Sequence, residues 1–429
     1  MFNFNENNEV LSGLTQRVIL AGLSTGEDIS DSMDELEGLA EAAGAEVLGR
    51  MIQVRERPET GTYFGKGKID ELAEICENMS ADAVIFNNEL SGIQLRNIEE
   101  KIGIAVLDRT VLILDIFARR AISNEGKLQV ELAQLKYRLP RLTGMGKSLS
   151  RTGGGIGTRG PGEKKLETDR RHIQSRIDEI KREIKEVQKS REVQRSRREK
   201  NAVPVVSLVG YTNAGKSAIM NALLKNTSKE EKTVFEEDML FATLDVSQRN
   251  IKLDSNREFI LIDTVGFVSK LPHSLIQAFK STLEEVLYSD LIIHVVDAAS
   301  KDCNFNMKVT DAVLKEIKAD NLPCIEVFNK MDLVQNQDEL PRTNNKCTYI
   351  SAKNGDGLEN LLNVIESEIF SDTKKADLII PYDKGAVTSW ICEHCNVDKI
   401  EYRDNGTYLE TYLRPADYNR LSIYFADNT

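Results

Sequence analysis

The sequence predicts a multidomain α/β protein. At 429 residues the chain is long enough for roughly three or four domains, each with its own core. Before residue 110, apolar strand-like runs alternate with amphipathic helical segments, which predicts a mostly parallel sheet. Near residue 210 a glycine-flanked loop follows an apolar run. We therefore expect an N-terminal α/β domain at 1–109, a basic helical hairpin with a glycine-rich loop at 110–202, a P-loop domain at 203–370 and a small C-terminal α/β domain at 371–429.

The N-terminal domain carries the alternation. Runs rich in β-branched residues predict strands at 17–21, 46–54, 83–86 and 104–107. Segments with apolar residues at helical spacing predict helices at 32–43, 68–77 and 94–102.

Two long helical segments follow, and each has one apolar stripe. The first, at about 110–139, repeats leucine at helical spacing: Leu128, Leu132, Leu135 and Leu139. The second, at about 165–200, alternates steps of four and three between apolar residues: Ile173, Ile177, Ile180, Ile184 and Val187. Such stripes form a seam between partner helices. We expect an antiparallel hairpin whose connection lies near residues 140–163.

Charge is distributed unevenly along the chain. The formal net charge is −12, but residues 136–200 contain 20 Lys and Arg against 9 Asp and Glu, so this segment carries +11 and the remainder −23. A basic arm can approach a phosphate backbone while the acidic remainder limits indiscriminate binding. The alternative is a solvated helix face without a ligand.

The connection between the two helices is rich in glycine and contains interspersed cations. So much glycine disfavours a packed core. The basic side chains, which we expect to be free to meet phosphates, are Arg141, Lys147, Arg151 and Arg159. A solvated linker is the alternative interpretation.

Residues 210–217 have the spacing of a phosphate-binding loop. The apolar run 205–209 predicts a strand before the loop and 218–224 a helix after it, so amide N–H groups and the helix dipole converge on an anion. We expect Lys216 to contact the β and γ phosphates and the Ser217 hydroxyl to bind Mg2+. The whole loop would contact nucleotide: Gly210, Tyr211, Thr212, Asn213, Ala214, Gly215, Lys216 and Ser217.

A second motif selects guanine. Asp332, shortly after an expected strand at 324–328, can accept hydrogen bonds from the N1–H and the exocyclic amine of guanine, a pair that adenine does not offer. Asn329 and Lys330 would contact the edge of the ring and cover its face. After a short strand at 348–350, a backbone N–H would meet the guanine oxygen from the turn Ser351, Ala352 and Lys353. Together the two motifs predict an enzyme that binds GTP and hydrolyses it to GDP and phosphate.

The segment between the two motifs has the features of a switch. The expected strand 258–262 ends at Asp263, which is placed to hold the magnesium shell, and the N–H of Gly266 can sense the γ-phosphate. Thr243 would be the second hydroxyl on Mg2+, with Thr233 as a weaker candidate, unless it caps its own loop. The expected catalytic groups are Lys216, Thr243 and Gly266, and the expected metal ligands are Ser217, Thr243 and Asp263.

Phe267 occupies the position where many switch GTPases carry a glutamine that orients the attacking water. Because phenylalanine makes no such hydrogen bond, intrinsic hydrolysis should be slow and should be assisted by a partner, a cation or another protein group. Asn213 is a candidate ligand for K+, which would supply positive charge; alternatively it stabilises the turn of its own loop.

Composition favours a soluble, cytoplasmic protein, which we expect to be a monomer. No apolar run approaches the roughly 20 residues of a membrane span, and the chain start lacks the segments of a signal peptide. Six cysteines show no disulfide-like framework. Cys392 and Cys395 have metal-like spacing, but no second pair completes four ligands, so we expect structural or incidental thiols rather than zinc. The last domain should follow a linker at 371–375, with strands at 378–380, 399–403 and 408–413.

These motifs resemble the HflX family of translational GTPases over roughly residues 15–370 and more weakly beyond. The GTP motifs are shared by many families, whereas the glycine-rich stretch joined to a following GTPase domain is specific. Lys164 departs from the family pattern, which has Thr or Ser there. The other matching segments are 61–68, 107–110, 115–118, 128–132, 153–169 and 380–383.

The resemblance implies a factor that binds the large ribosomal subunit in its GTP form and separates or rescues stalled ribosomes under stress. It also implies that the glycine-rich loop reaches toward the peptidyl-transferase region of ribosomal RNA, and that an apolar residue such as Phe267 is usual at its position. Two alternatives stay open: a GTPase that acts on another structured RNA, and a signalling GTPase whose helical arm binds a protein.

Overall fold

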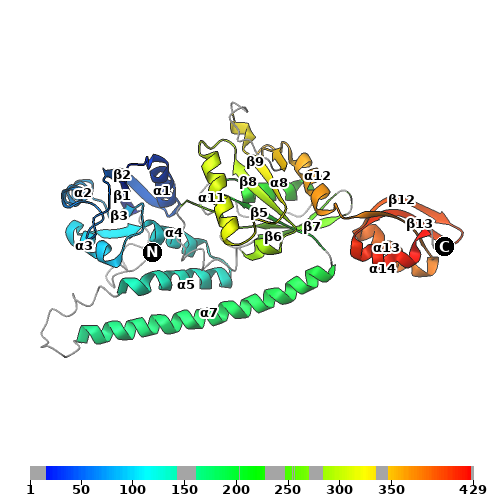
Figure 1. Cartoon of the computed structure of the whole chain (residues 1–429), viewed down its shortest axis with the longest axis horizontal. Helices are drawn as coiled ribbons and strands as arrows, with labels where there is room; N and C mark the ends of the chain where they lie inside the picture. The colour runs from blue at the N-terminus through cyan, green and yellow to red at the C-terminus, as the bar shows by residue number, and fades with distance from the viewer. Residues whose placement is uncertain are drawn as a thin grey trace. The chain divides into compact units, whose positions relative to one another are not determined.

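The computed structural model describes residues 16–142, 161–201, 203–227, 247–253, 255, 257–269, 284–334 and 346–426. The chain forms two compact units. The first contains the N-terminal domain and most of the hairpin; the second contains the P-loop domain and the C-terminal domain (Figure 1). Within the described ranges, no helix is long and apolar enough to cross a membrane.

The N-terminal domain is a four-stranded parallel sheet in the order β2-β1-β3-β4. Phe64 and Phe86 pack edge to face in its core, with ring centroids 5.1 Å apart. The strands are β1 (Gln16–Ser24), β2 (Ala45–Val54), β3 (Ala83–Phe86) and β4 (Ala105–Asp108). The helices between them are α1 (Ser30–Ala42), α2 (Lys66–Met79) and α3 (Gly92–Ile102). The expected alternation and the parallel sheet are confirmed.

Three more helices are described here, and the last of them continues into the second unit: α4 (Arg109–Arg120), α5 (Asn124–Arg141) and α7 (Pro161–Asn201). The single helical stretch expected at 110–139 is wrong. It is two helices because the Ser123 side chain accepts a hydrogen bond from the Gly126 N–H (2.9 Å) and starts α5 anew. The expected seam between α5 and α7 is confirmed, since their leucines and isoleucines form one buried cluster (Figure 1). Beside it, Arg176 on α7 binds both carboxylate oxygens of Glu131 on α5 (2.7 and 2.9 Å).

The P-loop domain is built on a six-stranded sheet in the order β10-β9-β8-β5-β7-β6. Only β6, at the edge, is antiparallel to its neighbour within the described sheet. The strands are β5 (Val205–Gly210), β6 (Ser247–Lys252), β7 (Glu258–Asp263), β8 (Leu291–Asp297), β9 (Cys324–Asn329) and β10 (Lys346–Tyr349). The helical elements are α8 (Lys216–Thr227), η2 (Glu284–Tyr288), α11 (Cys303–Glu316), η3 (Met331–Leu333) and α12 (Leu358–Ile369).

The C-terminal domain is a three-stranded antiparallel sheet in the order β11-β13-β12 with two covering helices. Its elements are β11 (Lys374–Ile380), η5 (Tyr382–Lys384), α13 (Gly385–His394), β12 (Asn396–Arg403), β13 (Gly406–Leu413), α14 (Pro415–Leu421) and η6 (Ser422–Tyr424). The linker expected at 371–375 is wrong in its second half. Lys374 and Lys375 already belong to β11, where they pair with Leu413 and Tyr412.

The two cysteines of the metal-like motif belong to the core of the C-terminal domain. Cys395 is buried in that core, and Cys392 packs against it. Burial raises the pKa of the Cys395 thiol to about 12, which disfavours the thiolate that a metal ion would bind. Nowhere in the described parts of the chain do three Asp, Glu, His or Cys side chains gather as a metal site of their own.

Candidate nucleotide site

The predicted nucleotide motifs meet at one edge of the P-loop domain. The parallel strands β5, β7, β8 and β9 end at Gly210, Asp263, Asp297 and Asn329, and β10 leads to Ser351. The carboxyl ends of parallel strands lie along the same edge of a sheet, which is where ligands of such folds bind. The fold therefore brings together residues that are more than a hundred positions apart in the sequence.

The backbone of the phosphate loop needs its glycines. Gly210 and Gly215 have φ angles of 151° and 93°, and Asn213 has φ of 60°. A Cβ atom on Gly210 would lie 2.2 Å from the Val295 carbonyl oxygen, and one on Gly215 would lie 2.1 Å from the Asn329 amide nitrogen. The left-handed conformation also gives a structural reason for asparagine at 213, because this residue tolerates positive φ.

The Lys216 side chain is hydrogen-bonded to the backbone of the phosphate loop. Its ammonium donates hydrogen bonds to the carbonyl oxygens of Gly210 (3.1 Å) and Tyr211 (2.9 Å). Burial lowers the pKa of Lys216 to about 8, while the nearby Asp263 carboxylate opposes this shift. A polyanionic phosphate in the loop would supply the negative charge that balances the buried ammonium.

Ser217 and Asp263 form an oxygen pair that suits Mg2+. The Ser217 hydroxyl donates to an Asp263 carboxylate oxygen at 2.6 Å, at the start of α8 and the end of β7. Hydroxyl and carboxylate oxygens are the hard ligands that Mg2+ prefers, and the remaining ligands in such sites are phosphate oxygens and water. The residues present therefore fit the expected metal.

The segment after β7 is paired with the phosphate loop. The Thr212 N–H donates to the Phe267 carbonyl oxygen (2.7 Å), and the Phe267 N–H donates to the Gly210 carbonyl oxygen (3.1 Å). A Cβ atom on Gly266 would lie 2.7 Å from Thr212 Cγ2 and 3.0 Å from Lys216 Nζ. No side chain fits at 266, so its backbone lies close to the phosphate-binding lysine. The Phe267 ring is 2% exposed and serves packing.

Asn329 has a role that sequence reasoning missed. Its side-chain amide donates to the Ala214 carbonyl oxygen (3.0 Å), and its carbonyl oxygen accepts from the Ala352 N–H (3.0 Å). The amide thus ties the phosphate loop to the turn after β10. Contact between Asn329 and the guanine edge stays a prediction.

The other residues that we predicted to select guanine are oriented by side-chain contacts. An Asp332 carboxylate oxygen accepts a hydrogen bond from the Ser351 hydroxyl (2.6 Å). The Lys330 ammonium pairs with an Asp297 carboxylate oxygen at 2.8 Å. Asp297 was not predicted, although its position at the end of a buried apolar strand is a usable signal. Lys353 is exposed beside these residues.

His294, in the middle of β8, is a buried titratable group that the sequence did not single out. Burial lowers the pKa of His294 to about 4, and the charge of Lys216 lowers it further. The imidazole is therefore neutral near pH 7 and adds no second positive charge near Lys216. A lone histidine in an apolar strand carries no sequence signal for this role.

Some predicted residues lie outside the described ranges. Thr243 and Thr233, expected near Mg2+, belong to this group, as do Lys147, Arg151 and Arg159 of the glycine-rich stretch.

One prediction for the basic arm is wrong. Arg141 is not free to meet phosphates: only 16% of its side chain is exposed. Its guanidinium donates hydrogen bonds to the carbonyl oxygens of Tyr137 (3.1 Å) and Leu90 (2.8 Å) and to the Glu89 carboxylate (2.9 Å). The arginine is used to fasten the end of α5 to the N-terminal domain.

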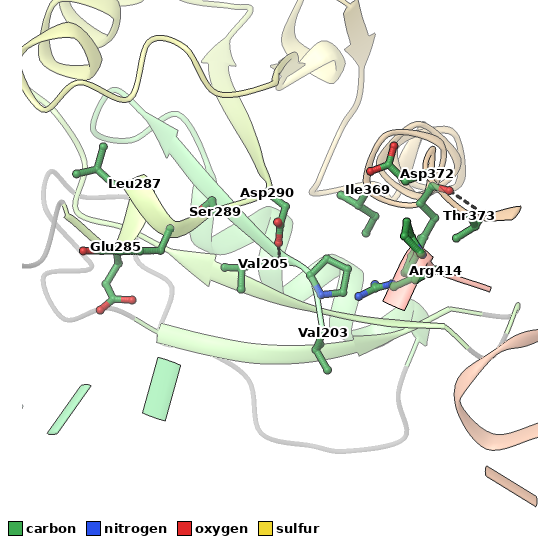
Figure 2. Close-up of a pocket in the computed structure, with 14 residues that line it drawn as sticks. Val203, Val205, Glu285, Leu287, Ser289, Asp290, Ile369, Asp372, Thr373 and Arg414 are labelled. Carbon is green, nitrogen blue, oxygen red and sulfur yellow. Dashed lines mark hydrogen bonds between the residues drawn. The ribbon is translucent and has the colours of Figure 1, made fainter. Parts of the chain in front are cut away.

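A pocket of about 550 Å³ lies elsewhere in the second unit (Figure 2). It is lined by Val205 at the start of β5, by Asp290 and by Arg414 and Pro415 of the C-terminal domain. Asp290 accepts a hydrogen bond from the Val205 N–H at 2.7 Å (Figure 2). Because β5 reaches the phosphate loop at its other end, this pocket is not the nucleotide site.

The fold and the site define a P-loop GTPase. Models of protein families match four successive regions: a GTP-binding GTPase N-terminal region at 30–118, a GTP-binding GTPase middle region at 120–198, a 50S ribosome-binding GTPase at 205–330 and an HflX C-terminal domain at 338–422.

Full-length relatives give the same result. The chain is similar to GTPase HflX of Caldanaerobacter subterraneus, at 49% identity over 93% of this chain and 91% of the relative. It is 46% identical to GTPase HflX of Lacrimispora saccharolytica over 97% of each chain, and 38% identical to that of Escherichia coli over 95% of each. The chain belongs to the HflX family of GTPases.

Solved structures resemble the chain more distantly. A GTP-binding protein from the archaeon Sulfolobus solfataricus in complex with GDP is 23% identical, with a TM-score of 0.45, and the match covers 83% of this chain and 99% of that one.

Proposed function

We propose that this GTPase binds the large ribosomal subunit in its GTP form and separates or rescues stalled ribosomes under stress. The observation that carries the proposal is the match of residues 205–330 to a 50S ribosome-binding GTPase. The basic arm at 136–200 supports it, because clustered cations beside a glycine-rich stretch suit a phosphate backbone. Arg151 and Arg159 remain our candidates for the RNA contacts.

The nucleotide would act through the loop that follows β7. Gly266 is packed against Thr212 and close to the Lys216 ammonium, so the third phosphate would lie beside its N–H. Binding of GTP would change the pairing of Phe267 with Gly210 and Thr212, and hydrolysis would restore it. Such a change would let the ribosome distinguish the GTP form from the GDP form.

Mg2+ would be held by Ser217 and Asp263, with Thr243 as the predicted third protein ligand. When bound, the ion would neutralise negative charge on the β and γ phosphates. Asn213 remains a candidate ligand for K+. A comparison of hydrolysis in K+ and Na+ at equal ionic strength would test this role, and equal rates would exclude it.

Co-sedimentation tests the proposal directly. The full chain would be centrifuged with large ribosomal subunits in the presence of GDP or a non-hydrolysable GTP analogue, and intact ribosomes would be assayed for release of subunits. We expect pelleting with the analogue, little with GDP, and subunit release with GTP. Binding that is RNase-sensitive but absent from ribosomes would favour a GTPase of another structured RNA. RNase-resistant binding to a protein would favour a signalling role.

A further inference from the structure

The last turn of α5 is bound to two other parts of the first unit: the turn between β3 and α3, and the junction of β4 and α4. Arg141, its last residue, donates hydrogen bonds to the Leu90 carbonyl oxygen (2.8 Å) and to Glu89 (2.9 Å), both in the turn between β3 and α3. Its guanidinium carbon lies 3.4 Å from the centre of the Tyr137 ring. The Arg141 Nε is buried and has no hydrogen-bond partner among the described residues, so the guanidinium is largely withdrawn from water.

A buried carboxylate lies beneath this arginine. Asp108, fully buried at the junction of β4 and α4, accepts hydrogen bonds from the Tyr137 hydroxyl (2.7 Å), the Leu90 N–H (3.0 Å) and the Val111 N–H (3.0 Å). Arg141 approaches the same carboxylate at 3.6 Å. Buried charges are stable only when they are paired and hydrogen-bonded, so this network specifies one arrangement.

The end of α5 is also closely packed against the start of α3. A Cβ atom on Gly92, the first residue of α3, would lie 3.1 Å from the Arg141 Cα. The backbone at the end of α5 is thus in contact with α3, while its side chains are bound to the turn before α3 and to Asp108 at the end of β4. The chain therefore leaves α5 from an end whose backbone and side chains are both held in place.

We propose that Arg141, through Tyr137 and Asp108, is a positioning residue that fixes where the chain leaves α5 for the RNA-binding stretch. The inference rests on the proposed ribosome binding. A binding segment that leaves a rigid end loses less conformational freedom on association than one that leaves a frayed helix. The network therefore raises affinity for RNA without touching it.

Lysine at 141 separates this role from a direct phosphate contact. Lysine keeps the charge and reaches phosphates, but it cannot make the forked hydrogen bonds or stack on Tyr137. A phosphate ligand would tolerate the change; a positioning residue would not. Salt dependence separates the roles again, because each phosphate contact contributes about 0.7 to 0.9 to the slope of log affinity against log salt concentration.

The experiment measures binding of large subunits by the full chain with a GTP analogue at several salt concentrations. The variants are Arg141→Lys, Arg141→Met and Tyr137→Phe, with Arg138→Lys, exposed on the same helix turn, as the charge-conserving control. We expect Arg141→Lys to bind about tenfold more weakly with an unchanged salt slope and an unchanged GTP affinity. Tyr137→Phe should weaken binding in the same way, and Arg138→Lys should match the parent.

Three outcomes would overturn the inference. Parent-like binding by Arg141→Lys would show that charge alone suffices at 141. A salt slope shallower by about one in Arg141→Met, with Arg141→Lys intact, would identify a phosphate contact. If Arg141→Lys and Tyr137→Phe lower the melting temperature but the folded variants bind large subunits as tightly as the parent, the network contributes to stability and not to RNA binding. If the parent itself binds subunits equally with GDP and the analogue, the proposed function is wrong, a result that is distinct from all three.

Discussion

Single residues show how a loop that predicts only phosphate binding becomes selective. Asn329, 2% exposed, joins the phosphate loop to the turn after β10, and Ser351 orients Asp332 by a 2.6 Å hydrogen bond. One amide side chain thus joins the loop predicted to bind phosphate to the turn predicted to bind guanine. Two predictions belong to this scale.

The first prediction concerns Lys216 and pH. Its pKa is about 8 in the nucleotide-free protein and should rise when GTP phosphates surround it. Below pH 8 the ammonium is already charged and affinity should be constant. Above pH 8 the free protein has lost a proton that the complex retains, so binding takes up a proton and affinity falls, at most tenfold per pH unit.

Calorimetry in buffers of different ionisation enthalpy would measure this uptake near pH 9. In Lys216→Arg, which stays charged at that pH, binding is weaker and should take up less proton than in the parent, because only the guanine N1–H then contributes. An absence of uptake in the parent would contradict the role assigned to Lys216.

The second prediction concerns base selection. Replacing Asp332 by asparagine removes the acceptor for two guanine donors, so GTP should bind more weakly by about 3 kcal/mol or more. Xanthosine triphosphate, which carries an oxygen in place of the amine, should bind the Asp332→Asn variant better than GTP. Titration of the parent and of the Asp332→Asn variant with both nucleotides measures this change in preference. Ser351→Ala, which leaves the carboxylate in place, should retain a preference for guanine, and a loss of that preference would assign selection to other groups.

Among the elements, the hairpin depends on the seam between α5 and α7. Ile180 is fully buried there, whereas Val187 is only partly buried. Ile180→Ala should lower the free energy of opening by about 3 kcal/mol, because a cavity replaces part of a close-packed side chain. Hydrogen exchange of α5 and α7 amides should then be more than a hundredfold faster. Val187→Ala should change exchange far less, and equal effects would mean that the seam is not the source of hairpin stability.

The same scale shows where local pattern reasoning fails. Apolar periodicity alone cannot distinguish one long helix from two, and it merged α4 with α5. The break depends on a cap: the Ser123 hydroxyl satisfies the Gly126 N–H and starts a second helix. At the start of β11, likewise, Lys374 and Lys375 look like a polar linker until their backbone pairs with β13.

In the whole molecule, the glycine-rich stretch of the basic arm, rather than the outer face of α7, should make the RNA contacts. Arg151→Ala with Arg159→Ala should weaken ribosome association and reduce the salt slope by about 1.5, while GTP affinity stays the same. Lys185→Ala with Lys189→Ala removes the same charge from exposed positions of α7 and should leave the slope unchanged. Sedimentation at four or more salt concentrations gives both slopes. Equal slopes for the two double variants would remove the glycine-rich stretch from the interface.

GTP as the ligand, the succession of domains and the family could all be predicted from the amino-acid sequence. Phosphate loops, guanine motifs and apolar periodicities are local patterns. They can be recognised without knowing which distant segments of the chain come into contact. Three contacts became visible only in the folded chain: Asn329 joins two loops, Asp297 pairs with Lys330, and Arg141 is buried and hydrogen-bonded instead of being a free cation. The reason is physical: a polar side chain acts through the partners that burial brings to it, and those partners come from segments far away in the chain.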